Sequence, residues 1–231
     1  MKMTETNLGY LIETQKITVL LGGEKSQILN LNASFTDFDF IRVKQTHGDV
    51  VVHSKSVDLD YQVEADAHFT ELEKTALCIS TADCIPVFLF DSKTETIAGI
   101  HAGWRGVANQ IVPKTFKRLQ TMGATPENTH VIVGPHIQMA SFEVSHSVRD
   151  EILSSIGFSA ATESSLYHKN INAEKSLVDL HQVMRTQLQN CGVTHENLFS
   201  LHIDTFVDRR FHSHRRDKEK AGRQLSFICK N

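Results

Sequence analysis

Three short segments of the chain each combine a metal-ligating or nucleophilic residue with small neighbours. They are QTHG at 45–48, TADC at 81–84 and HAGWRG at 101–106. Glycine in such a turn lets the backbone approach a ligand closely. Two imidazoles and one thiolate are a ligand set of catalytic zinc sites, in which a fourth position stays open for water or substrate. We therefore predict that His47, Cys84 and His101 bind one metal ion, zinc in the first place and copper as the alternative.

The same three side chains also support chemistry without a metal. In a cysteine hydrolase, Cys84 would be the nucleophile and His47 or His101 its base. Their separations of 37 and 17 residues match no short zinc-finger motif, and a single buried cysteine is often only a small apolar residue. The metal site is favoured because the three segments fall at successive strand ends. Asp83, next to Cys84, is expected to orient one imidazole or to act as an acid.

Residues suited to bind an anion follow the third segment and recur near the C-terminus. Arg105 begins a predicted helix, where a guanidinium and free N–H groups suit a phosphate, although a surface salt bridge is the alternative. Trp104 suits stacking on a heterocycle or simple packing. Arg215 lies in a basic cluster that is typical of a solvated face and also suits anion binding.

The elements that position these residues are mostly strands. Apolar runs rich in branched residues predict strands over Ile17–Leu21, Phe40–Lys44, Val50–His53, Ala76–Ser80, Ile85–Phe90, Thr96–Ile100, His130–Val133, Leu198–His202 and Gln224–Cys229. Helical spacing predicts helices over Arg105–Met122, Ser145–Ile156 and Ser176–Cys191, with Pro113 bending or restarting the first. Because the strands come in runs, we predict an α+β fold with mixed sheets flanked by helices.

Composition excludes several classes of protein. The 231 residues include 24 basic and 27 acidic side chains. Because basic residues are not in excess, we expect no nucleic-acid partner. No apolar stretch is long enough to span a membrane, and the first 15 residues lack the apolar core of a signal peptide. The four cysteines form no CxxC pair, which is typical of reduced thiols in a cytoplasmic protein. Without repeats or linkers, residues 1–231 are expected to form a single domain.

The motifs together resemble those of the YfiH-like proteins, also called the laccase-domain or multicopper polyphenol oxidase family. Besides the three segments, the matching stretches are ADA at 65–67, Gly134-Pro135, Phe142-Glu143-Val144, Asp179-Leu180, RRD at 215–217 and Gly222-Arg223. The chain departs from the family pattern at His136, where a cysteine is usual, and at His212 and His214, where aromatic residues are usual.

The resemblance implies a YfiH-like fold in which His47, Cys84 and His101 gather around one zinc. It further implies phosphorolysis of purine nucleosides (adenosine, inosine and methylthioadenosine), with an added adenosine deaminase activity. For such a reaction we predict that Arg105, Trp104 and Arg215 bind phosphate and substrate.

Asp83 or Glu143 is then the acid that protonates the leaving base. The alternatives are copper-dependent polyphenol oxidation and Cys–His hydrolysis of cell-wall precursor peptides. The sequence leaves open the preferred purine and whether a homodimer forms.

Overall fold

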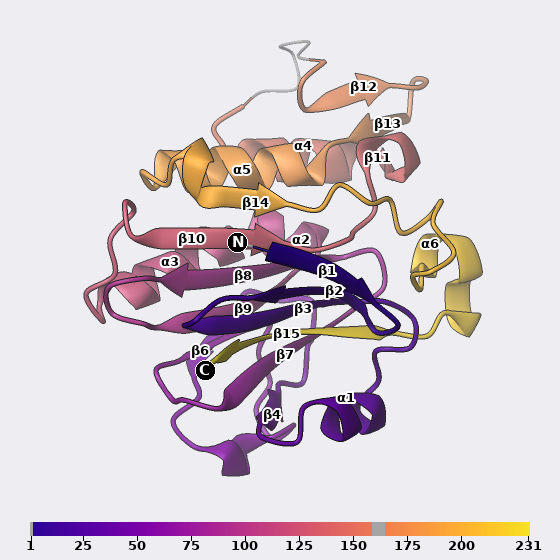
Figure 1. The fold of residues 1–231 in the computed structure, drawn as a ribbon. Helices are drawn as coiled ribbons and strands as arrows, with labels where there is room; N and C mark the ends of the chain where they lie inside the picture. The colour runs from indigo at the N-terminus through magenta and orange to yellow at the C-terminus, as the bar shows by residue number, and fades with distance from the viewer. Residues whose placement is uncertain (1, 159–164) are drawn as a thin grey trace.

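Two six-stranded sheets pack face to face and form the centre of the molecule (Figure 1). The computed structural model describes residues 2–158 and 165–231. The first sheet has the order β1-β2-β3-β15-β7-β4 and the second β14-β10-β8-β9-β6-β5. Pairs β4–β7, β5–β6 and β10–β14 are parallel and the other pairs in these sheets are antiparallel. The α+β fold with mixed sheets is therefore confirmed.

The first sheet comprises β1 (Lys2–Thr6), β2 (Gly9–Glu13), β3 (Ile17–Gly22), β4 (Asp39–Arg42), β7 (Thr75–Thr81) and β15 (Gln224–Lys230). The second comprises β5 (Val51–His53), β6 (Ala67–Thr70), β8 (Ile85–Asp91), β9 (Ile97–Ala102), β10 (Thr129–Val133) and β14 (Leu198–Ser200). A small third sheet comprises β11 (Glu143–Ser145), β12 (His168–Asn170) and β13 (Lys175–Val178). The helices are α1 (Ile28–Ser34), α2 (Trp104–Ala108), α3 (Ile111–Gln120), α4 (His146–Ser154), α5 (Leu180–Asn190) and α6 (His214–Asp217).

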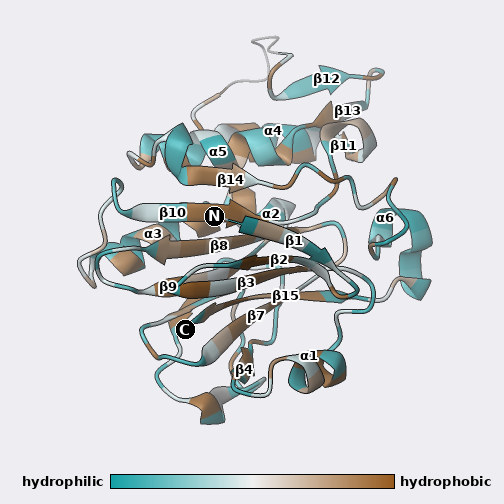
Figure 2. Ribbon diagram, viewed as in Figure 1, coloured by the Kyte–Doolittle hydropathy of each residue, from teal (hydrophilic) through white to brown (hydrophobic). Residues whose placement is uncertain are grey.

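Strand β8 shows how the layers are held together. All its residues are buried, and successive side chains point to opposite faces of a strand. Val87 and Leu89 pack toward α3 and α5, whereas Phe88 and Phe90 join the cluster between the two sheets. Figure 2 shows the resulting hydrophobic colour along β8 and β9 and the hydrophilic colour of α6. Burial on both faces explains why the central strands are continuous apolar runs in the sequence.

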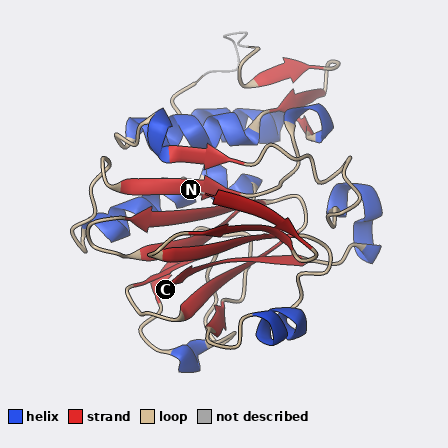
Figure 3. Ribbon diagram, in the orientation of Figure 1, coloured by secondary structure: helices blue, strands red, loops and turns tan. Residues whose placement is uncertain are grey.

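Helices lie at the outside of the sheets (Figure 3). Helices α3 and α5 contribute to the core on the far side of the second sheet, while Leu31 of α1 packs in the cluster that covers the outer face of the first. Within the described residues, no helix combines the length and the hydropathy that a bilayer crossing requires.

Every strand predicted from the sequence is present, but two helix predictions are wrong in part. The helix expected over 105–122 is divided because Gln110 adopts a left-handed conformation (φ 59°) between α2 and α3. Pro113 lies in the first turn of α3, where its missing N–H costs no hydrogen bond. The helix expected from Ser176 begins only at Leu180, since residues 175–178 pair as β13 and Asp179 caps the helix.

Candidate metal centre

The sheet topology brings three distant residues to one end of the molecule. His47 follows β4, which runs parallel to β7, and Cys84 lies in the turn from β7 into β8. His101 lies near the end of β9, which returns antiparallel to β8. One ligand atom from each of these residues lies within 4.8 Å of the other two, and this is the sole such histidine, cysteine and acid cluster among residues 2–158 and 165–231.

His101 is held by a cross-strand partner. The β6–β9 register pairs Ala67 with Ile100 and continues for one more residue, where the His101 backbone N–H donates to the Asp66 carbonyl at 2.7 Å. Directly paired residues project to the same face of a sheet. The imidazole Nδ1–H of His101 therefore donates to Asp66 Oδ1, at 2.7 Å, and both side chains are buried. This bond leaves Nε2 of His101 as the nitrogen available to the cluster.

The same carboxylate holds the turn that carries His47. Asp66 accepts backbone hydrogen bonds from Thr46 (3.1 Å), His47 (2.9 Å) and Gly48 (2.7 Å). His47 adopts a left-handed conformation with φ 62°, which is unusual for a residue with a side chain. Burial by itself raises the pKa of Asp66, but the hydrogen bonds from His101 and from the turn lower it to about 2. Asp66 is therefore a carboxylate at neutral pH.

Cys84 is in an environment that favours its thiolate. Burial alone raises the pKa of Cys84, but the charge of His101 and hydrogen bonds with His101 and His47 lower it to about 6. Burial alone would lower the pKa of His101, which the Cys84 thiolate and Asp66 raise to about 9. The thiolate is the form of cysteine that binds metals and attacks electrophiles.

The residues present fit a zinc or copper ion. Two imidazole nitrogens and a thiolate at these separations are a borderline-soft donor set that suits either metal. Gly103 keeps space beside the donors, since a Cβ there would lie 3.1 Å from Cys84 Sγ and 3.5 Å from His47 Cδ2. Three protein ligands leave a fourth position for water or substrate, as in catalytic zinc sites.

Asp83 does not orient a ligand imidazole, so that expectation is wrong. Asp83 has a left-handed backbone (φ 84°), and its carboxylate points to the C-terminal part of the chain. Oδ1 accepts from Thr205 Oγ1 at 2.7 Å, and Oδ2 accepts from the Arg215 backbone N–H at 2.6 Å. The carboxylate that orients His101 is Asp66, for which the sequence by itself predicted no role. Its signal was an acidic residue between alanines at the start of a buried strand.

Arg215 connects Asp83 with Glu143. The Arg215 guanidinium donates to the Glu143 backbone carbonyl at 2.9 Å and lies over the ring of Phe142. The Glu143 carboxylate is paired with Lys175 at 2.6 Å, and this hydrogen bond lowers its pKa. Glu143 is therefore ionised at neutral pH, which is the form that accepts a proton.

Arg105 and Trp104 begin α2 directly after the metal centre. The Arg105 guanidinium lies 4.4 Å from the centre of the Trp104 ring, and it makes no ion pair within the described part of the chain. Trp104 is partly buried against the core. Because α2 has only five residues, the expected help from a long helix N-terminus is small. Any anion binding here depends on the guanidinium itself.

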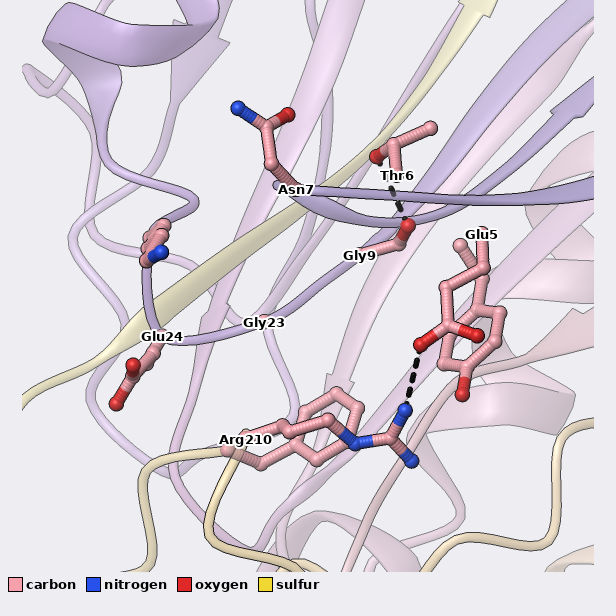
Figure 4. A pocket seen from close by; sticks show the side chains of 10 residues that line it. Glu5, Thr6, Asn7, Gly9, Gly23, Glu24 and Arg210 are labelled. Atoms are coloured by element: carbon pink, nitrogen blue, oxygen red, sulfur yellow. Dashed lines mark hydrogen bonds and ion pairs between the residues drawn. The ribbon is translucent and has the colours of Figure 1, made fainter.

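Two cavities border the first sheet. One, of about 240 Å³, borders the strands that lead to the ligands: Gln45 and Ser80 line it, two residues before His47 and four before Cys84. The other, of about 230 Å³, lies at the tip of the β1–β2 hairpin (Figure 4). There Arg210 is already paired with Glu5 at 2.6 Å. None of the residues predicted for the site lines either cavity.

The chain matches, over residues 3–231, the family described as Multi-copper polyphenol oxidoreductase laccase. It belongs to this laccase-domain family. A relative named purine nucleoside phosphorylase, from Clostridium acetobutylicum, is 31% identical over 205 residues, which is 88% of this chain and 82% of the relative. A relative named Adenosine deaminase RL5, from an unknown prokaryotic organism, is 29% identical over 82% of this chain and 74% of its own. The resemblance seen in the motifs is confirmed.

The fold is also that of solved structures. The crystal structure of Neisseria meningitidis protein NMB0706 superposes with a TM-score of 0.82 at 23% identity, covering 100% of this chain and 98% of that one. A Bacillus licheniformis protein, YfiH, gives the same TM-score at 24% identity and covers 98% of each chain.

The histidines at which this laccase-domain chain departs from the family pattern lie outside the metal cluster. His136 is buried, donates from Nδ1 to the Gly134 carbonyl at 2.8 Å and accepts at Nε2 from Gln138. The ring of His212 packs close to Gly222, and His214 is the exposed first residue of α6. These departures therefore leave the three candidate ligands in place.

Proposed function

We propose that the chain is a zinc-dependent purine nucleoside phosphorylase that converts adenosine, inosine and methylthioadenosine into the free base and ribose 1-phosphate (or its methylthio form). The observation that supports this most is the cluster of His47, Cys84 and His101, whose ligand atoms lie within 4.8 Å of one another. The names of the relatives support the substrate class, since most of those compared are called purine nucleoside phosphorylases.

The reaction places clear demands on the site. The bond between the ribose and the purine breaks while a phosphate oxygen bonds to the same ribose carbon, and the leaving base gains a proton. His47, Cys84 and His101 would hold the zinc, which when bound supplies a Lewis acid for an oxygen of substrate or phosphate. Asp66 fixes the orientation of His101 and holds a hydrogen on its Nδ1, so that Nε2 is the nitrogen that would bind the metal.

Arg105 is the proposed phosphate-binding residue. It lies four positions after His101, is exposed and has no ion-pair partner in the described structure. A guanidinium binds phosphate through two parallel hydrogen bonds, which also fix its orientation. Trp104, against which Arg105 stacks, is proposed to contact the base.

Arg215 is the second proposed contact to substrate or phosphate. Asp83 binds its backbone, and the Glu143 carbonyl binds its guanidinium. We therefore propose that both acidic residues position Arg215. This replaces proton donation by Glu143, because its pairing with Lys175 favours the ionised form.

Phosphate dependence tests the proposal directly. Purified protein with its metal content measured is incubated with inosine, with and without phosphate, and hypoxanthine and ribose 1-phosphate are quantified. We expect base release only with phosphate, and chelation should abolish it. An equal rate of base release without phosphate would overturn phosphorolysis. Ammonia released from adenosine measures the second proposed reaction, deamination, which the relative named adenosine deaminase favours.

A metal-free hydrolase is the second candidate, and one observation favours it. Cys84, His101 and Asp66 have the order of nucleophile, base and orienting carboxylate found in cysteine hydrolases. Such an enzyme would hydrolyse amide bonds, as in cell-wall precursor peptides, and would keep its activity in chelator. Polyphenol oxidation instead requires copper and consumes dioxygen, so an oxygen electrode with the copper-loaded protein separates it from both.

A further inference from the structure

We propose that Asp66 is the positioning residue of the metal centre: one buried carboxylate fixes both histidine ligands and selects the nitrogen that His101 offers to the ion. This inference rests on the metal site of the proposed function. Its first basis is the bonding of Asp66 Oδ1, which accepts from His101 Nδ1 at 2.7 Å and from the His47 backbone N–H at 2.9 Å. A single oxygen atom therefore contacts both histidine ligands.

The second oxygen fixes the turn around His47. Oδ2 accepts from the backbone N–H groups of Thr46 (3.1 Å) and Gly48 (2.7 Å) and from the Thr46 hydroxyl (3.1 Å). Together the two oxygens bind three consecutive backbone N–H groups, which stabilises the left-handed backbone of His47. The direction in which the His47 side chain leaves the turn depends on this conformation.

The chemistry of the acceptor decides which nitrogen of His101 binds the metal. A carboxylate can only accept, so Nδ1 must carry a hydrogen, and in the neutral imidazole that binds a metal the lone pair is therefore on Nε2. An amide at the same position has one accepting and one donating end. The N–H₂ end cannot accept a hydrogen bond, so it is unfavourable next to backbone N–H groups. Two such groups lie at the Oδ2 position and one at the Oδ1 position. We therefore expect the N–H₂ group to occupy the Oδ1 position, next to Nδ1 of His101.

Asp66→Asn then reverses the protonation of His101. The amide N–H₂ group would donate to Nδ1, which moves the imidazole hydrogen to Nε2 and blocks the ligand nitrogen. Outer residues that orient metal-bound histidines typically contribute about 10- to 100-fold to metal affinity. We expect Asp66→Asn to weaken zinc binding by at least that range, because it both removes the orienting acceptor and opposes the required tautomer.

Asp91, at the end of the second sheet opposite to Asp66, offers a matched control. Asp91 is also fully buried and also accepts three backbone N–H bonds, from Lys93 (3.1 Å), Thr94 (2.8 Å) and Thr125 (3.1 Å). No histidine is bonded to it among the described residues. Asp91→Asn should therefore lower stability as Asp66→Asn does but leave zinc affinity unchanged.

The experiment measures zinc affinity by competition with a chromophoric chelator and follows cobalt binding through the thiolate-to-cobalt absorption band. We expect a dissociation constant raised by about 10- to 100-fold or more in Asp66→Asn and unchanged in Asp91→Asn. Equal affinities in Asp66→Asn and wild type would overturn the inference alone. Failure of the wild-type protein to bind either metal would overturn the proposed function as well.

A measurement on the wild-type protein covers the case in which Asp66→Asn does not fold. In the zinc-loaded protein, long-range proton–nitrogen NMR spectra should show His101 protonated at Nδ1 and ligated through Nε2. Ligation through Nδ1 would overturn the inference, because Asp66 could not then be bonded to that atom.

Discussion

Gly103→Ala adds a single methyl group beside all three candidate ligands. Gly103 has φ −71° and ψ 169°, which alanine adopts without strain, so the substitution acts only through its Cβ. That atom would lie 3.1 Å from Cys84 Sγ, 3.5 Å from His47 Cδ2 and 3.9 Å from His101 Cε1. Since ordinary contacts between carbon atoms are roughly 3.5–4.0 Å, the Cys84 thiolate must move by several tenths of an ångström.

The expected loss of metal affinity follows from that displacement. Overpacking a well-filled site costs about 1–3 kcal/mol. If this cost falls on the metal-bound arrangement, the zinc dissociation constant should rise by roughly 5- to 150-fold, at about 1.4 kcal/mol for each factor of ten. Gly103 is also the N-cap of α2, where alanine costs up to about 1 kcal/mol. The free energy of unfolding should therefore fall only slightly.

Zinc affinity by chelator competition and unfolding by urea titration separate these two effects. Gly48→Ala is the matched control, because its Cβ would make ordinary contacts, 3.4 Å from Thr46 Oγ1 and 3.5 Å from Asp66 Oδ2. We expect Gly48→Ala to retain wild-type affinity. The reasoning is refuted if Gly103→Ala binds zinc as tightly as wild type, or if both variants lose affinity equally.

Three further predictions concern single side chains. Cys84→Ala should lose both the metal and phosphate-dependent base release while keeping the circular dichroism spectrum of the fold; full metal content in this variant would remove Cys84 from the ligand set. Arg105→Ala should raise the apparent phosphate requirement by about 10- to 100-fold, equivalent to roughly 1.4–2.8 kcal/mol, without altering zinc content; an unchanged phosphate dependence would point to Arg215 instead. Burial is the main reason why the pKa of His136 in the folded protein is lowered to about 4, so the side chain is buried in neutral form. In the unfolded chain the same imidazole binds a proton below about pH 6.5. The free energy of unfolding therefore falls as the pH drops from about 6.5 toward 4. Between pH 7 and pH 5, the free energy of unfolding should therefore fall by about 2 kcal/mol less in His136→Gln than in wild type, as measured by urea titration. Equal decreases in the two proteins would contradict a neutral buried imidazole.

The sequence alone determined those features of this protein that depend on local pattern and residue type. Strands buried on both faces must be continuous apolar runs, so β7, β8 and β9 were recognisable without knowledge of their partners. The donors of the metal centre were recognisable for a similar reason: few residue types bind zinc, and His47, Cys84 and His101 each stand in a segment of small residues near the end of a predicted strand. The family followed from the same motifs.

The tertiary structure decided which carboxylate serves that centre. Asp83 is adjacent to Cys84 in sequence, yet its left-handed backbone turns the side chain toward Thr205 and Arg215. Asp66 reaches His101 because the β6–β9 register places the two residues opposite each other. Tertiary contacts also set the start of α5, because residues 175–178 pair with β11 and β12 as a strand rather than continuing the helix. Strand register and pairing are contacts between distant segments, and a local pattern specifies which face a side chain takes but not which side chain lies across from it.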